Sequence, residues 1–265
     1  MIRKLFLFSG GAFLVALVCL AGAAALVSNE VGTKGWNIGL IKDGDRVRIG
    51  KGEAGKPEPS TSKTIAWTGG DLLAIDLPAD VVYTQGPVAS VTVTGPQSLV
   101  NRITLDNGRL SIADGPEHRE SLNFTWGKDG FEARTSHEGA RITVTAPNVK
   151  RFEMTGSGDL DLRGYDQPSI DVSIAGSGSV HAVGRSKTLK LNVSGSGSAD
   201  LAALETQDAD VSVNGSGDAT IHAKGAVRID ISGSGNVNLA TKPAKIDTTI
   251  SGSGTVDDND SSESN

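Results

Sequence analysis

The chain has few aromatic residues, one cysteine and no excess of positive charge. Three Trp, two Tyr and six Phe in 265 residues argue against the mixed core of an ordinary α/β enzyme and favour thin layers of small and β-branched residues. There are 25 Lys and Arg against 31 Asp and Glu, which gives a formal net charge of −6. With no basic stripe as well, this charge excludes nucleic acid as a partner.

The only cysteine, Cys19, lies in a hydrophobic leader. Residues 1–25 begin with the basic pair Arg3 and Lys4 and end in a run of small residues, which is the layout of a secretory signal peptide. The uncharged run is also long enough for an uncleaved membrane anchor. If the leader is cleaved, the mature chain has no thiol for a disulfide or a cysteine metal site.

Glycine is abundant instead, with 34 residues, and much of it occurs in six copies of Gly-Ser-Gly. The copies are separated by steps of 20, 19, 20, 18 and 19 residues and begin at Gly156, Gly176, Gly195, Gly215, Gly233 and Gly252. A period near 19 residues is typical of one coil of a β-solenoid, in which each repeat stacks on the last.

Apolar residues stand at even distances from each copy. In the second copy, for example, Ile170, Val172 and Ile174 precede Gly176, and Val180 and Ala182 follow it. A period of two indicates strands, so each repeat is predicted to be two strands joined at Gly-Ser-Gly. Stacked in parallel, the repeats would form an all-β, right-handed parallel β-helix with coils of ~19 residues.

Glycine suits these corners because it accepts a positive φ and close backbone approach without a Cβ penalty. The predicted structural turns are Gly156, Gly158, Gly176, Gly178, Gly195, Gly197, Gly215, Gly217, Gly233, Gly235, Gly252 and Gly254. The regular repeats are expected over 151–256, and an acidic, disordered tail over 257–265.

The preceding part of the chain is less regular. Residues 26–63 are polar and rich in Gly, Lys, Pro and Ser, which predicts a flexible linker. From residue 64 to 150 short alternating runs predict strands, and Asn107-Gly108 predicts a tight turn between two of them. No segment after the leader has helical periodicity. The solenoid domain is therefore expected to cover 64–256.

A polar excursion at 113–140 interrupts these strands and carries Phe124, Trp126 and Phe131. One interpretation is that the three aromatics cover an open end or flank of the β-core. The other is that they form a partner-binding loop, since clustered exposed aromatics mark binding sites. On this second interpretation the three residues are the partner-binding site.

No catalytic, cofactor or metal site is predicted. A phosphate loop is excluded because each Gly-Ser-Gly lies between strands rather than before a helix. The four histidines, His118, His137, His181 and His222, do not form a column, and no Ser-His-Asp pattern accompanies them. The expectation is a protein without enzymatic activity or cofactor.

Residues 66–256 resemble a bacterial family called putative auto-transporter adhesin, head GIN domain. The resemblance rests on the segments 74–85, 91–95, 107–112 and 142–152 and on the repeated apolar-x-Gly-Ser-Gly-x-apolar units. It implies an exported or envelope-attached parallel β-helix and no established enzymatic role.

The sequence therefore predicts an exported binding, adhesion or structural module of the bacterial cell envelope. The alternative is a protein that binds or processes envelope polysaccharide through the 113–140 excursion. Expected partners are an envelope protein, a polysaccharide or a second copy through the strand edges. Membrane contact is expected only through an uncleaved N-terminal segment, and the location is the periplasm or cell envelope.

Overall fold

A computed structural model describes residues 36–43, 46–51, 59–113, 120–127, 130–135 and 139–258. The chain divides into two compact units, one from residues 1–57 and 116–137 and the other from 58–115 and 138–265. Of the smaller unit the structure describes the backbone of four strands. The predicted leader at 1–25 and residues 259–265 of the predicted tail lie outside the described residues. Asp257 and Asp258, which the prediction placed in the disordered tail, belong to the last strand, β21 (Thr255–Asp258).

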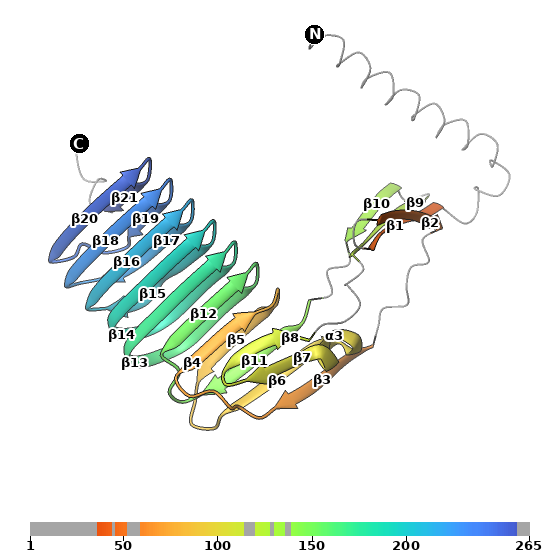
Figure 1. Cartoon of the computed structure of the whole chain (residues 1–265), viewed down its shortest axis with the longest axis horizontal. Coiled ribbons are helices and arrows are strands. Elements are labelled where there is room, and N and C mark those ends of the chain that lie inside the picture. The colour runs from red at the N-terminus through yellow and green to blue at the C-terminus, as the bar shows by residue number, and fades with distance from the viewer. Residues whose placement is uncertain are drawn as a thin grey trace, which may run out of the picture. The chain divides into compact units, whose positions relative to one another are not determined.

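The larger unit is a solenoid of stacked parallel coils, as the repeat predicts (Figure 1). Each coil runs through one strand, a corner, and a second strand on the opposite side. The strands before the corner form the pre-corner sheet, and those after it form the post-corner sheet. β13 (Asp159–Gly176) and β14 (Ser179–Gly195) pass from one sheet to the other and contribute to both.

In the pre-corner sheet the strands follow the order β7 (Ile103–Asp106), β8 (Arg109–Ile112), β4 (Leu72–Asp76), β12 (Arg151–Gly156), β13, β14, β16 (Asp208–Gly215), β18 (Ala226–Gly233) and β20 (Lys245–Gly252). The post-corner sheet has the order β3 (Ser60–Ile65), β6 (Ser90–Pro96), β11 (Arg141–Ala146), β5 (Asp80–Gln85), β13, β14, β15 (Ser198–Thr206), β17 (Asp218–Ala223), β19 (Asn236–Leu239) and β21 (Thr255–Asp258).

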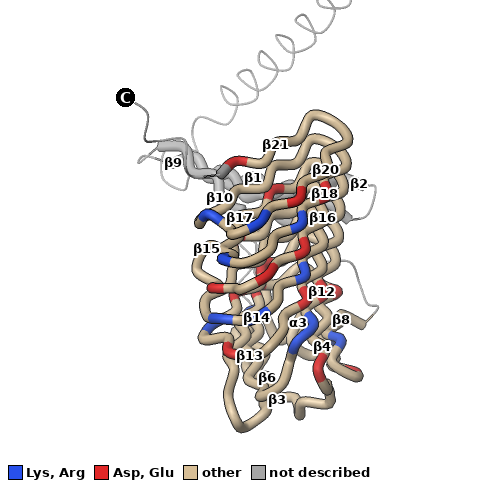
Figure 2. The backbone as a smooth tube through the Cα atoms, turned by 90° about the vertical axis from the view of Figure 1, so that its left-hand side faces the viewer, with Lys and Arg blue, Asp and Glu red and all other residues tan. Residues whose placement is uncertain are grey.

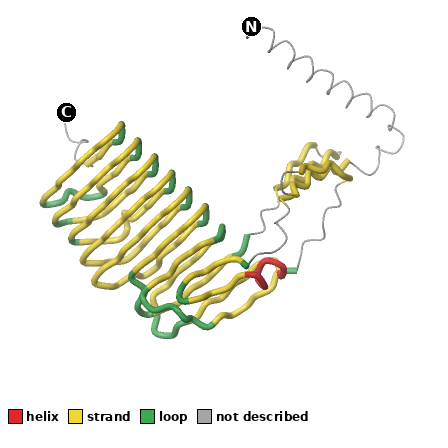
Figure 3. The backbone as a smooth tube through the Cα atoms, viewed as in Figure 1, coloured by secondary structure: helices red, strands yellow, loops and turns green. Residues whose placement is uncertain are grey.

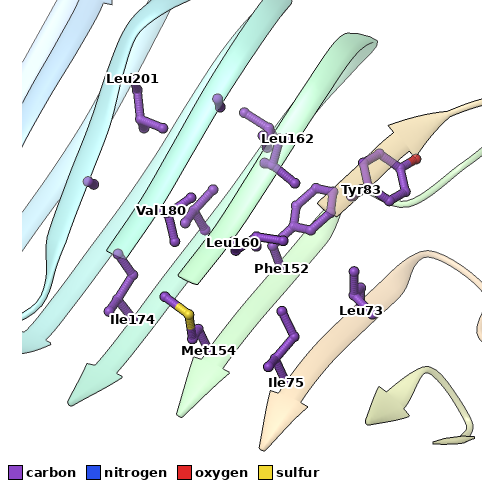
Figure 4. Packing of buried hydrophobic residues seen from close by; sticks show 14 of the residues in the cluster. Leu73, Ile75, Tyr83, Phe152, Met154, Leu160, Leu162, Ile174, Val180 and Leu201 are labelled. Atoms are coloured by element: carbon purple, nitrogen blue, oxygen red, sulfur yellow. The ribbon is translucent and has the colours of Figure 1, made fainter. Parts of the chain in front are cut away.

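The core consists of apolar columns that run through the stack. Met154, Ile174, Val193, Val213 and Ile231 are successive register partners, and each is at most 2% exposed. Figure 4 shows Met154 and Ile174 of this column among neighbouring buried side chains of the core. Alternation along each strand places these residues inside and the intervening polar residues outside.

The first coils contain a row of three buried aromatic residues. The ring of Phe152 lies 5.1 Å from that of Tyr83 and 5.9 Å from that of Tyr165, both in edge-to-face arrangements. The Tyr83 hydroxyl donates to the Ala146 carbonyl at 2.8 Å, and the Tyr165 hydroxyl donates to the Ser169 carbonyl at 2.8 Å. Burial raises the pKa of Tyr83 to about 12 and raises that of Tyr165 further.

The excursion at 113–140 is inserted into the corner of the first coil. β8 pairs in parallel with β4, and β11 pairs in parallel with β5. If these registers are continued, Ile112, Ala113 and Ala140 align with the corner Leu77-Pro78-Ala79 of the next coil. The registers of β12 with β4 and of β13 with β5 align that corner in turn with Gly156-Ser157-Gly158. The two earliest corners therefore lack the Gly-Ser-Gly sequence but occupy the same place in the stack.

The all-β fold class is confirmed, and the described residues add one short helix that the sequence pattern does not indicate. α3 (Gln97–Arg102) connects the post-corner strand β6 to the pre-corner strand β7 (Figure 3). It buries Leu99 and Val100. Six residues make fewer than two helical turns, which is too short for a 3.6-residue periodicity to be visible in the sequence. Between β7 and β8 the predicted turn is present, with positive φ at Asn107 and Gly108.

The structure also corrects the linker predicted for 26–63. β1 (Trp36–Asp43) and β2 (Arg46–Lys51) form an antiparallel sheet with β9 (Glu120–Gly127) and β10 (Gly130–Thr135) from the excursion, in the order β10-β9-β1-β2. β3 also begins at Ser60, inside the predicted linker. Pairing with strands about 80 residues away in the chain supplies order that local composition does not reveal.

Candidate binding surfaces of the solenoid

The two glycines of each Gly-Ser-Gly corner meet different constraints. The first glycine has positive φ, between 103° and 136° over the six copies. The second glycine has ordinary φ but is packed against the coil below, so that a Cβ on Gly197 would lie 2.7 Å from the Gly178 carbonyl oxygen. Each corner therefore needs glycine once for conformation and once for space.

Between these glycines the serines are exposed and linked through their backbone. The Ser177 and Ser196 amides donate to the carbonyls of Gly156 and Gly176, each at 2.9 Å. In the described part of the chain no hydrogen bond joins one serine hydroxyl of this column to the next. The corner column is thus a row of outward-pointing hydroxyls available to an external partner.

A second polar column follows the corner on the post-corner sheet. It contains the register partners Asp80, Asp159, Ser179, Ser198, Asp218, Asn236 and Thr255. Near the last coils the column is hydrogen-bonded, with Asn236 Nδ2 donating to Asp218 Oδ1 at 2.9 Å and Thr255 Oγ1 donating to Asn236 Oδ1 at 2.8 Å. Small polar side chains in register make this face flat and rich in hydrogen-bonding groups.

On the pre-corner sheet the outer surface carries alternating charge. One column of register partners reads Arg151, Asp171, Lys190, Asp210, Arg228 and Asp247, so the sign changes at every coil. We call this column the charge ladder. Figure 2 shows acidic and basic residues interleaved along the stack.

The alternation extends around the second corner. There Arg185 Nη2 lies 2.7 Å from Asp166 Oδ2, and Lys224 Nζ lies 3.1 Å from Glu205 Oε2. Hydrogen bonding to Arg185 lowers the pKa of Asp166, and hydrogen bonding to Lys224 lowers the pKa of Glu205. Sequence reasoning missed these columns because it aligned the apolar positions of the repeat and not the charged ones.

The ladder borders a groove of about 350 Å³ across the last coils of the pre-corner sheet. The groove is lined by Thr188, Leu189, Asp208, Ala209, Asp210, Ala226, Val227, Arg228, Lys245 and Asp247. Its lining contains both acidic and basic side chains. Ala226 lies between Asp208 and Lys245 in the stack, and its small side chain leaves space between those two longer ones.

The histidines make separate contacts. His181 Nδ1 lies 3.4 Å from Asp200 Oδ2 on the exposed surface, whereas His222 Nδ1 lies 3.2 Å from the Ala202 carbonyl. His118 and His137 lie outside the described residues. Among the described residues there is no group of three side chains suited to hold a metal ion.

The three aromatics singled out in the excursion occupy related positions in the small sheet. Trp126 on β9 is opposite Phe131 on β10 and also opposite Trp36 on β1, and Phe124 is opposite Ile38. Opposed and alternating positions share one face of an antiparallel sheet, so one face carries all of these residues. Trp36 escaped the sequence analysis because it lies in the segment taken as a linker.

Stacked two-strand coils with polar outer columns define a parallel β-solenoid whose accessible chemistry is on its outer surface. Residues 71–243 match the model of the family described as putative auto-transporter adhesin, head GIN domain, and the chain belongs to this family. The resemblance found in the sequence is thereby confirmed.

One solved structure with a TM-score above 0.5 shares the fold. A putative adhesin from Bacteroides fragilis is 17% identical with a TM-score of 0.56, over 76% of this chain and 97% of that chain. A putative adhesin from Parabacteroides distasonis is also 17% identical over 76% of this chain and 97% of that chain, with a TM-score of 0.45. No curated protein matches the chain. In the described residues no helix has the length and apolar character to cross a membrane.

Proposed function

We propose that the protein is an exported, non-enzymatic binding module of the bacterial cell envelope, and that it contacts its partner through the outer faces of the solenoid. The observation that carries the proposal is the division of side chains between inside and outside. Core positions such as Leu162, Val193 and Ile221 are fully buried, whereas the repeated hydroxyl, amide and carboxylate groups stand outside. Membership of an adhesin family supports the same function.

The post-corner column is the face best suited to this role. Its side chains are short and aligned in register, and Asp218, Asn236 and Thr255 are hydrogen-bonded to one another, which reduces the entropy lost when a partner binds near the last coils. Aligned donors and acceptors spaced at one strand separation, about 4.8 Å, can bind a partner with a matching repeat. Such a surface favours many weak contacts over one deep site.

Substitutions on the two faces test the proposal. Replacement of Ser179, Ser198 and Asn236 by Arg in the full chain should reduce binding to purified cell-envelope fractions at least tenfold. The matched control replaces Ser194, Asn214 and Ser232, a column of the pre-corner sheet, with the same three arginines. Circular dichroism checks that both variants fold, and unchanged envelope binding by both would contradict a role for the post-corner face.

Export can be tested directly. We expect the mature protein to be found in the periplasm or cell envelope, either cleaved after the run of small residues at 21–25 or retained by an uncleaved anchor. Mass spectrometry of the N-terminal peptide from envelope fractions distinguishes the two forms. Recovery of the intact chain from the cytoplasm alone would contradict export.

A second candidate function is polysaccharide binding through the small sheet. The observation in its favour is the row Trp36, Trp126 and Phe131 on one face. Changing Trp126 and Phe131 to alanine should then abolish retention on envelope polysaccharide. Their neighbours Thr125 and Glu132 are register partners on the other face, and the same change there is the control. Equal retention of both variants would exclude this candidate.

A further inference from the structure

The two ends of the solenoid are built differently. At the N-terminal end the edge strand β3 places Lys63 opposite the buried Val93, and Lys63 Nζ donates to the Ile103 carbonyl at 3.3 Å. α3 adds the buried side chains Leu99 and Val100 at this end. A charged residue facing inward on an edge strand, together with a covering helix, prevents another strand from adding.

At the C-terminal end β21 places Asp258 opposite the buried Leu239, whereas β20, the other strand of the last coil, has no comparable protection in the described residues. All eight residues of β20 are exposed, including Ile246 at 46% and Ile250 at 43%. The residues in the same register positions on β18, Val227 and Ile231, are 2% and 0% exposed. Within the described ranges no strand pairs with the outer edge of β20 or β21, the last coil in Figure 1. This edge leaves backbone N–H and C=O groups free to pair with an added strand.

The charge ladder indicates what chemistry the edge accepts. Lys190 has Asp171 and Asp210 as register partners, and Arg228 has Asp210 and Asp247. Each basic residue inside the stack thus stands between two carboxylates. Asp247 ends the ladder on β20 with a basic neighbour on one side and an open edge on the other. A basic residue on an added strand would restore the pattern, since opposite charges on neighbouring strands attract.

We propose that the β20 edge is a docking site for an extended strand of a partner protein. The strand adds in parallel, with apolar residues beside Ile246 and Ile250 and a lysine or arginine beside Asp247. Backbone hydrogen bonds hold the strand, and the alternating side chains select it, as in other β-augmentation sites. This inference rests on the proposed function as a binding module and names the chemistry of one partner.

A labelled peptide with the sequence of residues 186–195 is a suitable probe. In the stack this segment places Leu189, Lys190 and Val193 in the columns of Ile246, Asp247 and Ile250. The full chain should bind the peptide, as measured by fluorescence anisotropy, and Asp247→Lys should weaken binding roughly three- to tenfold. A peptide with Lys190→Asp should show the reverse preference and bind the Asp247→Lys variant better than the natural chain.

One test substitution, one control substitution and a control peptide examine whether binding occurs at the β20 edge and in which orientation. Val88→Lys adds a charge at an exposed apolar residue elsewhere and should leave peptide binding unchanged, whereas Ile246→Lys should abolish it. In the same register a peptide of reversed sequence brings lysine beside Asp247 when it adds antiparallel and asparagine there when it adds parallel, and stronger binding of that peptide would overturn the parallel arrangement.

Three results would overturn the proposal. The first is absence of charge-dependent peptide binding. The second is concentration-dependent sedimentation that Ile246→Lys abolishes, which would make a second copy the occupant of the edge. The third is strong hydrogen-exchange protection of β20 amides in the monomer without peptide, which would show that the chain covers its own edge. If the peptide does not bind but arginine at Ser179, Ser198 and Asn236 still reduces binding to envelope fractions, this inference is rejected and the proposed function stands.

Discussion

At the residue scale the corners depend on backbone conformation and on close approach between coils. The first glycine of a copy has a φ that residues with a Cβ rarely adopt, and the second lies too close to the coil below to carry one. The serine between them meets neither constraint and is exposed. Neighbouring positions of one short motif should therefore differ widely in their tolerance of substitution.

Substitution of Gly195 tests this difference. Its φ is +116°, and a Cβ there would lie 2.5 Å from the Gly176 carbonyl oxygen. Gly195→Ala should lower the free energy of unfolding by roughly 1–3 kcal/mol because it combines backbone strain with a steric clash. Ser196→Ala, one residue on, should change it by less than about 0.5 kcal/mol. Equal denaturation midpoints for the two variants would contradict the assignment of Gly195.

The buried tyrosines predict an alkaline limit of stability. Because burial raises the pKa of Tyr83 in the folded state to about 12, the unfolded chain loses the phenolic proton first, near pH 10. Stability is therefore complete below about pH 10 and falls as the pH rises towards 12. The double variant Tyr83→Phe and Tyr165→Phe removes both tyrosines of the chain and should lose less stability in this interval. Urea unfolding at pH 7 and pH 11 measures the difference, and an equal loss in both proteins would contradict it.

At the scale of elements the coils differ in charge. Residues 159–178 contain four Asp and one Arg, 179–197 contain two Lys and one Arg without an acid, and 198–217 contain four acids without a base. These successive coils have net charges of −3, +3 and −4, so electrostatic attraction accompanies the hydrophobic columns between them. A strand that slipped by one residue would also turn its apolar side chains outward, so both effects favour one register.

Reversing one charge of the ladder should cost stability. Lys190→Asp places three carboxylates in adjacent positions and should lower the free energy of unfolding by about 1–2 kcal/mol, with partial recovery at 1 M salt. The control is Asn192→Asp, two residues along the same strand, whose register partners Ser173 and Ser212 are uncharged. A similar, salt-independent effect in both variants would mean that the ladder does not stabilise the stack.

The elements also show where sequence reasoning succeeds and where it stops. The columns at Met154 and Gly156 follow from a repeat inside a single sequence, because stacking places like residues over like residues. By contrast, the corner Leu77-Pro78-Ala79 has no sequence likeness to Gly-Ser-Gly, and the pairing of β1 with β9 joins segments about 80 residues apart. Such features arise from long-range pairing, and local composition carries no signal for them.

At the scale of the whole molecule the excursion is an insertion in a complete coil. Removing residues 114–139 would join Ala113 to Ala140 and leave a corner of the same length as Leu77-Pro78-Ala79. We expect this deletion to keep the solenoid folded, with its main thermal transition within a few degrees of the natural chain. Deleting 117–142 instead removes the same number of residues but cuts into β11, and should destabilise the first coils. Calorimetry of both variants decides, and unfolding of the first variant would contradict the insertion.

The sign change in the charge ladder makes the true repeating unit of the stack two coils long. Removing the single coil 177–195 would bring Asp171 against Asp210, and Asp166 against Glu205, so like charges would meet in two places. Removing the pair 177–215 would bring Asp171 against Arg228 and keep every neighbour opposite in sign. Gain or loss of coils in this protein is therefore favoured in even numbers, a parity rule that its apolar columns and glycine corners do not impose.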